Sequence, residues 1–128
     1  MPLTIGTTEQ KPGLIEIALG GRLDTETSPQ LEKKLTEVLS QPVRAVRFEM
    51  SLLEYISSMG IRVLFKAFKT LRAKKAMFLL VNPQPQIKKV LEIAQALPKE
   101  AVFESVQEAD DYFDDMQKKA LEQRAEDV

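Results

Sequence analysis

The sequence predicts a single α/β domain: a mixed, mostly parallel sheet of about five strands covered by about four helices. Two patterns support this prediction. Apolar residues alternate with polar ones in several short stretches, and between these stretches they recur at three- and four-residue steps. The first spacing is typical of half-buried strands and the second of amphipathic helices. Strands that alternate with helices of ten or more residues favour parallel pairing.

The chain is predicted to open with a β-hairpin. Residues 3–8 form a β-rich run, and Lys11-Pro12-Gly13 is a turn signal that leads into Leu14 to Leu19. Two such runs joined by a short turn are expected to pair antiparallel. We expect Gly20-Gly21 to end the second strand.

Helices and strands should then alternate to the end of the chain. Polar residues from Asp24 to Ser28 are N-cap candidates ahead of Pro29, which favours a first helical turn. The predicted elements are a helix that stops before Pro42, a strand over 43–50, a helix after Ser58, an apolar strand over 76–81, a helix from about Ile87 to Leu97-Pro98, a short edge strand at Val102-Phe103 and a last helix capped by Ser105.

We expect residues 1–113 to form the domain and 114–128 to be a charged C-terminal helix extension or tail. This last segment is rich in charge and has few apolar anchors. The apolar faces of the hairpin and of the last helix are too short to demand a dimer. We therefore expect a monomer or a weak dimer.

Composition excludes several classes of chemistry. The chain of 128 residues has no cysteine and no histidine, so it lacks disulfides, thiol nucleophiles, imidazole bases and the common zinc ligands. A net charge of -1 gives no global attraction to nucleic acid or membrane. No stretch reaches the length of a membrane span or resembles a signal peptide. We expect a cytoplasmic protein without a metal or cofactor.

The middle of the chain is the most informative stretch. Ser57 and Ser58 lie where the strand period changes to the helix period. The first turn of a helix leaves backbone N–H groups unpaired and carries partial positive charge, so a serine there can cap the helix and a phosphate is tolerated. Gly60 costs about 1 kcal/mol against alanine inside a helix, unless another group must approach its backbone.

These residues carry a family resemblance. The run from Tyr55 to Leu64 resembles the signature of the STAS domain family, which includes the bacterial anti-sigma factor antagonists and in which Asp-Ser-Ser/Thr/Ala-Gly-Leu precedes a helix. Alignment on Gly60 places Ser58 at the position that is phosphorylated in the family. Ser57 then falls where most members have aspartate. The stretch from Gly20 to Asp24 resembles the family's second motif, Gly-x-Leu/Ile-Asp, and the resemblance covers about residues 3 to 113.

The resemblance implies an anti-sigma factor antagonist that acts as a phosphorylation-controlled switch. The unphosphorylated form would bind an anti-sigma factor serine kinase, which supplies the ATP, and sigma factor would be released. Phosphorylation of Ser58, or alternatively Ser57, would block binding by placing about -1.5 to -2 charges in the contact surface. By the same resemblance, the expected partner-binding residues are Asp24, Ser57, Ser58, Met59, Gly60, Ile61 and Arg62, with Ile61 half in the core.

Other functions remain open. Because Ser57 replaces the usual aspartate, the serine loop could be a constitutive protein contact in a STAS-type scaffold or accessory subunit of a signalling or lipid-transport assembly. An enzyme is disfavoured, since a serine nucleophile needs a base and an Asp24–Ser pair has no oxyanion motif beside it. Nucleotide binding is also disfavoured, because the sequence offers no phosphate-binding glycine loop.

Overall fold

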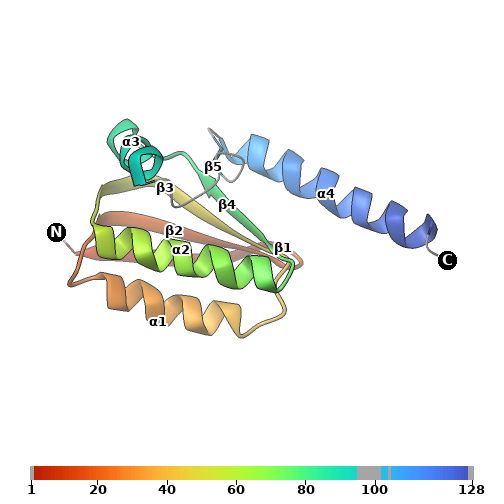
Figure 1. Cartoon of the computed structure of the whole chain (residues 1–128), viewed down its shortest axis with the longest axis horizontal. Helices are drawn as coiled ribbons and strands as arrows, with labels where there is room; N and C mark the ends of the chain where they lie inside the picture. Colours follow the sequence, from red (N-terminus) through yellow and green to blue (C-terminus); the bar gives the residue numbers. More distant parts are fainter. Residues whose placement is uncertain (1, 95–101, 104, 127–128) are drawn as a thin grey trace.

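We describe a computed structural model of the chain, covering residues 2–94, 102–103 and 105–126. It contains a five-stranded sheet in the order β1-β2-β3-β4-β5 (Figure 1). β1 pairs antiparallel with β2, and every later pair is parallel. The elements are β1 (Leu3–Lys11), β2 (Leu14–Leu23), α1 (Ser28–Leu39), β3 (Ala45–Ile56), α2 (Ser58–Ala73), β4 (Met77–Val81), α3 (Pro85–Ala94), β5 (Val102–Phe103) and α4 (Val106–Glu126). The predicted fold class is confirmed.

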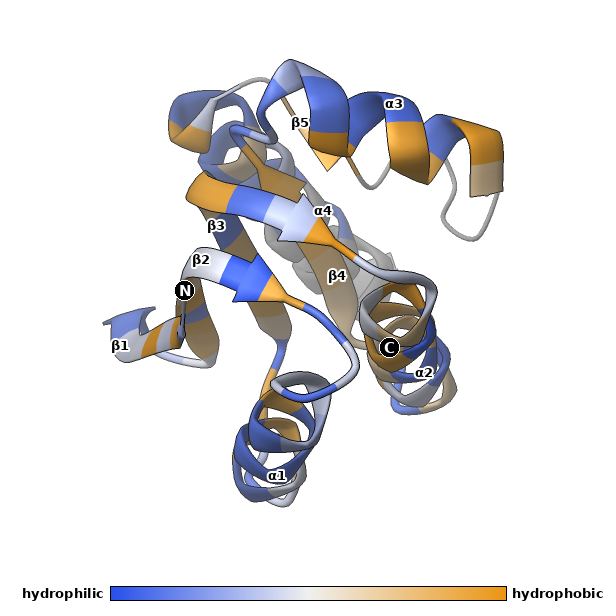
Figure 2. Ribbon diagram, turned by 90° about the vertical axis from the view of Figure 1, so that its left-hand side faces the viewer, coloured by the Kyte–Doolittle hydropathy of each residue, from blue (hydrophilic) through white to orange (hydrophobic). Residues whose placement is uncertain are grey.

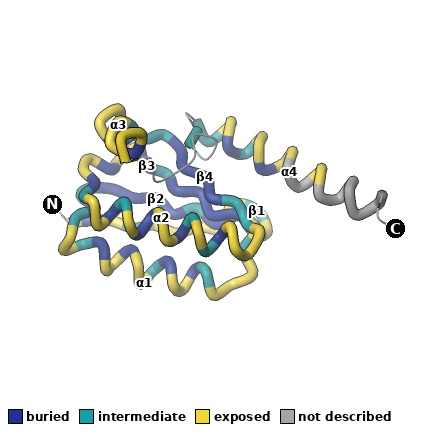
Figure 3. Tube along the Cα trace, in the orientation of Figure 1, coloured by how far each residue is buried: buried dark blue, intermediate teal, exposed yellow. Residues whose placement is uncertain are grey.

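The main core lies between one face of the sheet and three helices. Side chains of α1, α2 and α3 pack there against alternate residues of the strands. Buried positions recur along these helices and dominate the central strands (Figure 3). Phe48 is fully buried at its centre, with its ring 5.0 Å from that of Phe78. α1 and α2 present polar side chains outward and apolar ones to the sheet, which is the amphipathic pattern that the sequence predicts (Figure 2).

The opposite face of the sheet is covered by α4. Ala109 and Phe113 of this helix pack on Leu14, Leu79 and other apolar residues of β2, β3 and β4. Arg47 of β3 is buried under the helix, with 2% of its surface exposed. Its guanidinium donates from Nη2 to Glu16 Oε2 at 2.5 Å and from Nη1 to Asp110 of α4. A buried cation held by two carboxylates therefore joins the helix to the sheet.

Three predicted boundaries of β2 and β3 are wrong. β2 does not end at Gly20-Gly21 but continues to Leu23, because Gly21 takes φ +86° and the pairing with β3 shifts register on either side of it. A side chain at Gly21 would meet the Pro2 carbonyl at 2.2 Å. β3 begins at Ala45 rather than Val43 and runs past Met50 to Ile56. Both strands are longer than predicted because the β2–β3 ladder continues past its two register shifts.

The other predicted elements agree in kind and order with the structure where it describes them, although β1 runs past residue 8 to Lys11 and α3 begins at Pro85 rather than Ile87. The Ser105 hydroxyl accepts a hydrogen bond from the Glu108 N–H, so it caps α4 as expected. α3 is described to Ala94, and its predicted end near Leu97-Pro98 lies outside the described residues. α4 continues without a break through residue 114 to Glu126, so the division of the chain at 113 remains a prediction.

Candidate functional site

The two predicted motifs meet at one edge of the sheet. Leu23 at the end of β2 is paired with Ile56 at the end of β3. The Ser57 N–H donates to the Leu23 carbonyl at 2.9 Å, which ties the start of one loop to the end of the neighbouring strand. The loop that begins at Asp24 and the loop that contains Ser57 therefore leave the sheet side by side, as parallel strands dictate.

Ser57 is the N-cap of α2. Its backbone is extended, with φ -93° and ψ 171°, and its hydroxyl accepts a hydrogen bond from the Gly60 N–H at 3.2 Å. Its carbonyl accepts from the Ile61 N–H at 3.0 Å. This half-buried serine satisfies one of the backbone donors that every helix start leaves unpaired.

Ser58 occupies a different environment one residue later. It is exposed and is the first residue of α2. Its hydroxyl makes no hydrogen bond within the described part of the chain, whereas that of Ser57 is used for capping. Of the two candidate phosphorylation sites, Ser58 is thus the exposed one, and its hydroxyl takes no part in capping the helix.

Gly60 allows close approach of the strand to the helix. A Cβ at this position would lie 2.8 Å from Leu23 Cγ, 2.9 Å from the Leu23 carbonyl oxygen and 3.0 Å from Ile56 Cγ1. The two contacts with Leu23 are shorter than real Cβ atoms show, and one of them is with backbone. The sequence argument that something approaches the Gly60 backbone is confirmed, and the approaching group is the end of β2.

Asp24 organises the first of the two loops. Its Oδ1 accepts hydrogen bonds from the backbone N–H groups of Glu26 and Thr27, both at 3.0 Å, and from the Thr27 hydroxyl at 3.1 Å. The hydrogen bond from the Thr27 N–H lowers the pKa of Asp24 below its ordinary value, although burial acts in the opposite direction. The Thr27 hydroxyl, the Glu26 N–H and the charge of Arg22 lower this pKa further. The carboxylate is therefore held ionised and shapes the turn before α1.

Among the remaining predicted contact residues, Met59 and Arg62 are exposed, and Ile61 is half-buried and packs against the core, as expected. Sequence reasoning missed Arg22 and Tyr55, which are paired across β2 and β3. The Arg22 guanidinium lies 4.0 Å above the centre of the Tyr55 ring. Arg22 stands one residue before the end of β2, and Tyr55 stands one residue before the end of β3. This shared position is the sequence signal that could have identified the pair.

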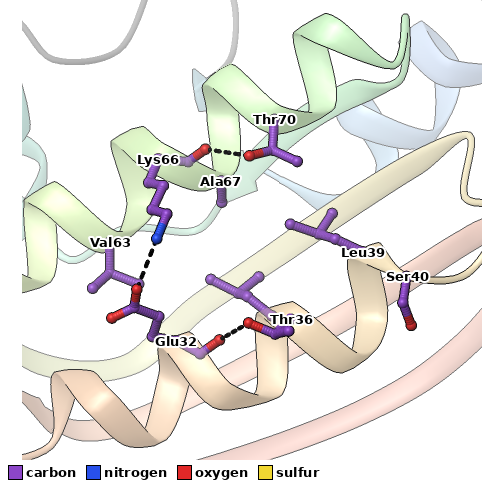
Figure 4. Close-up of a pocket in the computed structure, with 9 residues that line it drawn as sticks. Glu32, Thr36, Leu39, Ser40, Val63, Lys66, Ala67 and Thr70 are labelled. Carbon is purple, nitrogen blue, oxygen red and sulfur yellow. Dashed lines mark hydrogen bonds and ion pairs between the residues drawn. The ribbon is translucent and has the colours of Figure 1, made fainter.

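A groove runs between α1 and α2, lined by residues of both helices beyond their first turns (Figure 4). It has a volume of about 280 Å³, and its apolar lining comes mainly from Leu35, Leu39 and Val63. The Lys66 ammonium reaches across it to Glu32 at 2.9 Å.

No group of three or more carboxylates that could hold a metal ion occurs among the described residues. Within those same ranges, no helix combines the length and hydropathy that a bilayer crossing requires.

Comparison with known proteins agrees with this geometry. The model of the STAS domain family matches residues 7–109, which include both loops and both strands that carry them. The chain belongs to the STAS domain family. A protein of Bordetella bronchiseptica named as a candidate anti-sigma factor antagonist, BtrV, is 30% identical over 88 residues, which are 69% of this chain and 76% of that protein.

Solved STAS structures share the fold. The unphosphorylated form of SpoIIAA, called an anti-sigma factor antagonist, has a TM-score of 0.74 at 21% identity and covers 85% of this chain and 95% of that one. Phosphorylated SpoIIAA from Bacillus gives 0.69 at 21% identity, over 85% and 98%. A sulfate transporter family protein from Wolinella succinogenes gives 0.72 at 16% identity, over 87% and 93%. At these identities the likeness concerns the fold alone.

Proposed function

We propose that this protein is an anti-sigma factor antagonist whose binding to a protein partner is switched off by phosphorylation of Ser58. The observation that carries the proposal is the division between the two serines. Ser57 caps α2 through the Gly60 N–H, and Ser58 stands exposed beside it with its hydroxyl unengaged. A kinase can therefore modify Ser58 without removing the hydrogen bond that begins the helix.

The physical effect of such a phosphate supports a switch in binding. About -1.5 to -2 charges would be added at the start of α2, where the unpaired N–H groups and the helix dipole favour an anion. The domain would stay folded. A partner packed over Ser58, Met59 and the Asp24 loop would have to desolvate the phosphate, and the phosphate would repel acidic groups of that partner. Binding would be lost while the fold is kept.

The partner in this proposal is an anti-sigma factor with a serine kinase fold, which supplies the ATP. The name of BtrV and the two forms of SpoIIAA, unphosphorylated and phosphorylated, support this assignment. The chain would act as substrate and ligand rather than as an enzyme, and would work in the cytoplasm. Residues 1–113 would form the binding domain, with 114–128 as an extension.

A STAS-type scaffold is the second candidate. It is favoured by Ser57 at the usual aspartate position and by the likeness to the Wolinella transporter-family structure. In that case the same surface would bind its partner constitutively, and Ser58 would remain unmodified.

The test is phosphorylation by defined kinases. The purified protein is incubated with ATP and, one at a time, with the host's proteins of the anti-sigma serine kinase fold, and sites are mapped by mass spectrometry. One phosphate on Ser58, absent from the Ser58→Ala variant and accompanied by loss of kinase binding, is the expected result. Stable binding with no phosphate would support the scaffold, and phosphate on Ser57 would contradict the choice of serine.

A further inference from the structure

The outer face of α2 carries four basic side chains in a row. They are spaced four, three and three residues apart, which places them on one face of the helix, and all four are exposed. α2 contains no aspartate or glutamate, although the whole chain has a net charge of -1. We call this row the cationic stripe; it consists of Arg62, Lys66, Lys69 and Arg72.

An aromatic ring lies within the stripe. Phe65 is 37% exposed, and the Lys69 ammonium lies 5.5 Å from the centre of its ring. The ring also stacks on Phe68 at 6.5 Å, so it is supported from beneath. An open hollow of about 410 Å³ is bordered by Phe65, Thr70 and three cations of the stripe. An aromatic side chain bordered by cations in a hollow is typical of binding hot spots, which are enriched in aromatic residues and arginine.

Charge and shape together select the class of occupant. Between Arg62 and Arg72 the stripe extends about 15 Å along the helix, which matches about three turns of a partner helix. Carboxylates spaced along such a segment would meet the cations, and an apolar side chain would contact Phe65. Within the part of the chain that the structure describes, Lys66 is the one member of the stripe that already pairs with a carboxylate, that of Glu32 at 2.9 Å.

A membrane fits this surface less well. A helix that lies in a bilayer interface needs a free apolar face. The apolar face of α2 is instead committed to the core through Val63, Leu64, Ala67 and Leu71, all of them buried. The exposed apolar side chains of α2, Met59 and Phe65, are too small a surface for stable insertion.

We propose that the cationic stripe binds an acidic amphipathic segment of the protein partner, with Phe65 as its apolar anchor. The inference rests on the proposed function, because it specifies which kind of partner segment would bind the surface that begins at Ser58. Arg62 follows Ser58 by four residues and so lies on the same side of α2. A phosphate on Ser58 would compete with the acidic segment for Arg62.

The test is an NMR titration of the ¹⁵N-labelled full chain with a defined peptide. The probe is a synthetic amphipathic helix of about 16 residues, long enough to cover the stripe, built from Glu and Leu. Its control has Gln in place of every Glu. We expect amide shifts centred on α2 and binding that weakens at least about 10-fold with the Gln peptide or in the Arg62→Glu/Lys69→Glu variant.

The matched control is the Lys33→Glu/Lys89→Glu variant, which makes the same change in net charge at exposed lysines of α1 and α3. It should bind the Glu peptide like the unaltered protein. Thermal melts check the fold of both variants, and Arg62→Gln/Lys69→Gln replaces the charge reversal if that variant is unfolded.

Several outcomes would overturn the proposal: no shifts, shifts centred on another element, equal binding of the Gln peptide, or equal loss in the control variant. Binding to phosphatidylglycerol vesicles through the stripe, without binding to the peptide, would assign the surface to lipid instead. The titration does not require phosphorylation. It can therefore succeed while Ser58 proves unmodified, or fail while the phosphorylation switch stands.

Discussion

Replacement of Gly60 by alanine should destabilise the protein, although alanine favours helices. Helix propensity alone would give a gain of about 1 kcal/mol. The new Cβ, however, would lie 2.9 Å from the Leu23 carbonyl oxygen and 2.8 Å from Leu23 Cγ. That oxygen accepts the Ser57 N–H, so it cannot retreat without weakening the bond that ties the serine loop to β2.

The expected balance follows from these two effects. Overpacking of a tight site costs about 1–3 kcal/mol, from which the helix-propensity gain of about 1 kcal/mol must be subtracted. Because one of the contacts is with the Leu23 carbonyl oxygen, which cannot yield as a side chain can, the cost should lie in the upper part of that range, and we expect a net loss of about 1–2 kcal/mol in the free energy of unfolding. With an m-value of about 1–3 kcal/mol/M in urea, the midpoint should fall by roughly 0.3–2 M. Partner binding should weaken further, since Ser57 and Ser58 would be displaced.

Urea denaturation followed by circular dichroism measures this loss. Gly6→Ala is the matched control, because a Cβ at Gly6 meets no atom within 4 Å. A Gly60→Ala protein as stable as the unaltered one, or more stable by the helix-propensity gain, would refute the argument that the end of β2 requires glycine at this position.

Three further predictions concern the serine loop, the Asp24 turn and the second face of the sheet. Ser57→Ala should lower the free energy of unfolding by about 1 kcal/mol through loss of the N-cap, and Ser58→Ala should leave it nearly unchanged; equal effects in urea titrations would contradict the division between the serines. Because the pKa of Asp24 is lowered in the folded state, its stabilising effect is present above the unfolded value of about 3.9 and is lost as the pH falls below it. Thermal melts between pH 3 and 7 should therefore show a smaller acid-induced loss of stability in Asp24→Asn, and an identical pH dependence would exclude this contribution. Arg47→Ala should cost about 3–5 kcal/mol because it leaves two carboxylates without their buried cation. Replacing those carboxylates by amides in the same protein, through Glu16→Gln and Asp110→Asn, should recover part of that loss in the same denaturation assay.

The local patterns explain how much of this fold could be predicted. Alternation in β3 and the three- and four-residue steps in α2 arise from contacts with one core, so the sequence alone placed the change of period at Ser57. The capping role of serine and the close approach to Gly60 also followed from local chemistry. By contrast, Gly20-Gly21 reads as a terminator, since sequence does not reveal that a strand can bulge and continue.

Arg47 marks the limit of that reasoning. Its position among alternating residues indicates a side chain on the polar face of β3, and it does lie on the face away from Phe48. It is nevertheless buried, because α4 covers that face and brings Asp110, 63 residues further along the chain, to the guanidinium. The pair of Arg22 and Tyr55 escaped prediction for the same reason, since both depend on strand register.

The placement of the chain ends decides where a reporter group can be attached. Leu3 pairs with Gly21, so the first strand starts beside the loop edge that holds Asp24 and Ser57. α4 runs away from that edge toward the other end of the molecule (Figure 1). A fluorophore or affinity handle placed after α4 leaves the serine loop clear for a kinase or a partner. The same group fused ahead of Leu3 would crowd both loops and could imitate a loss of binding.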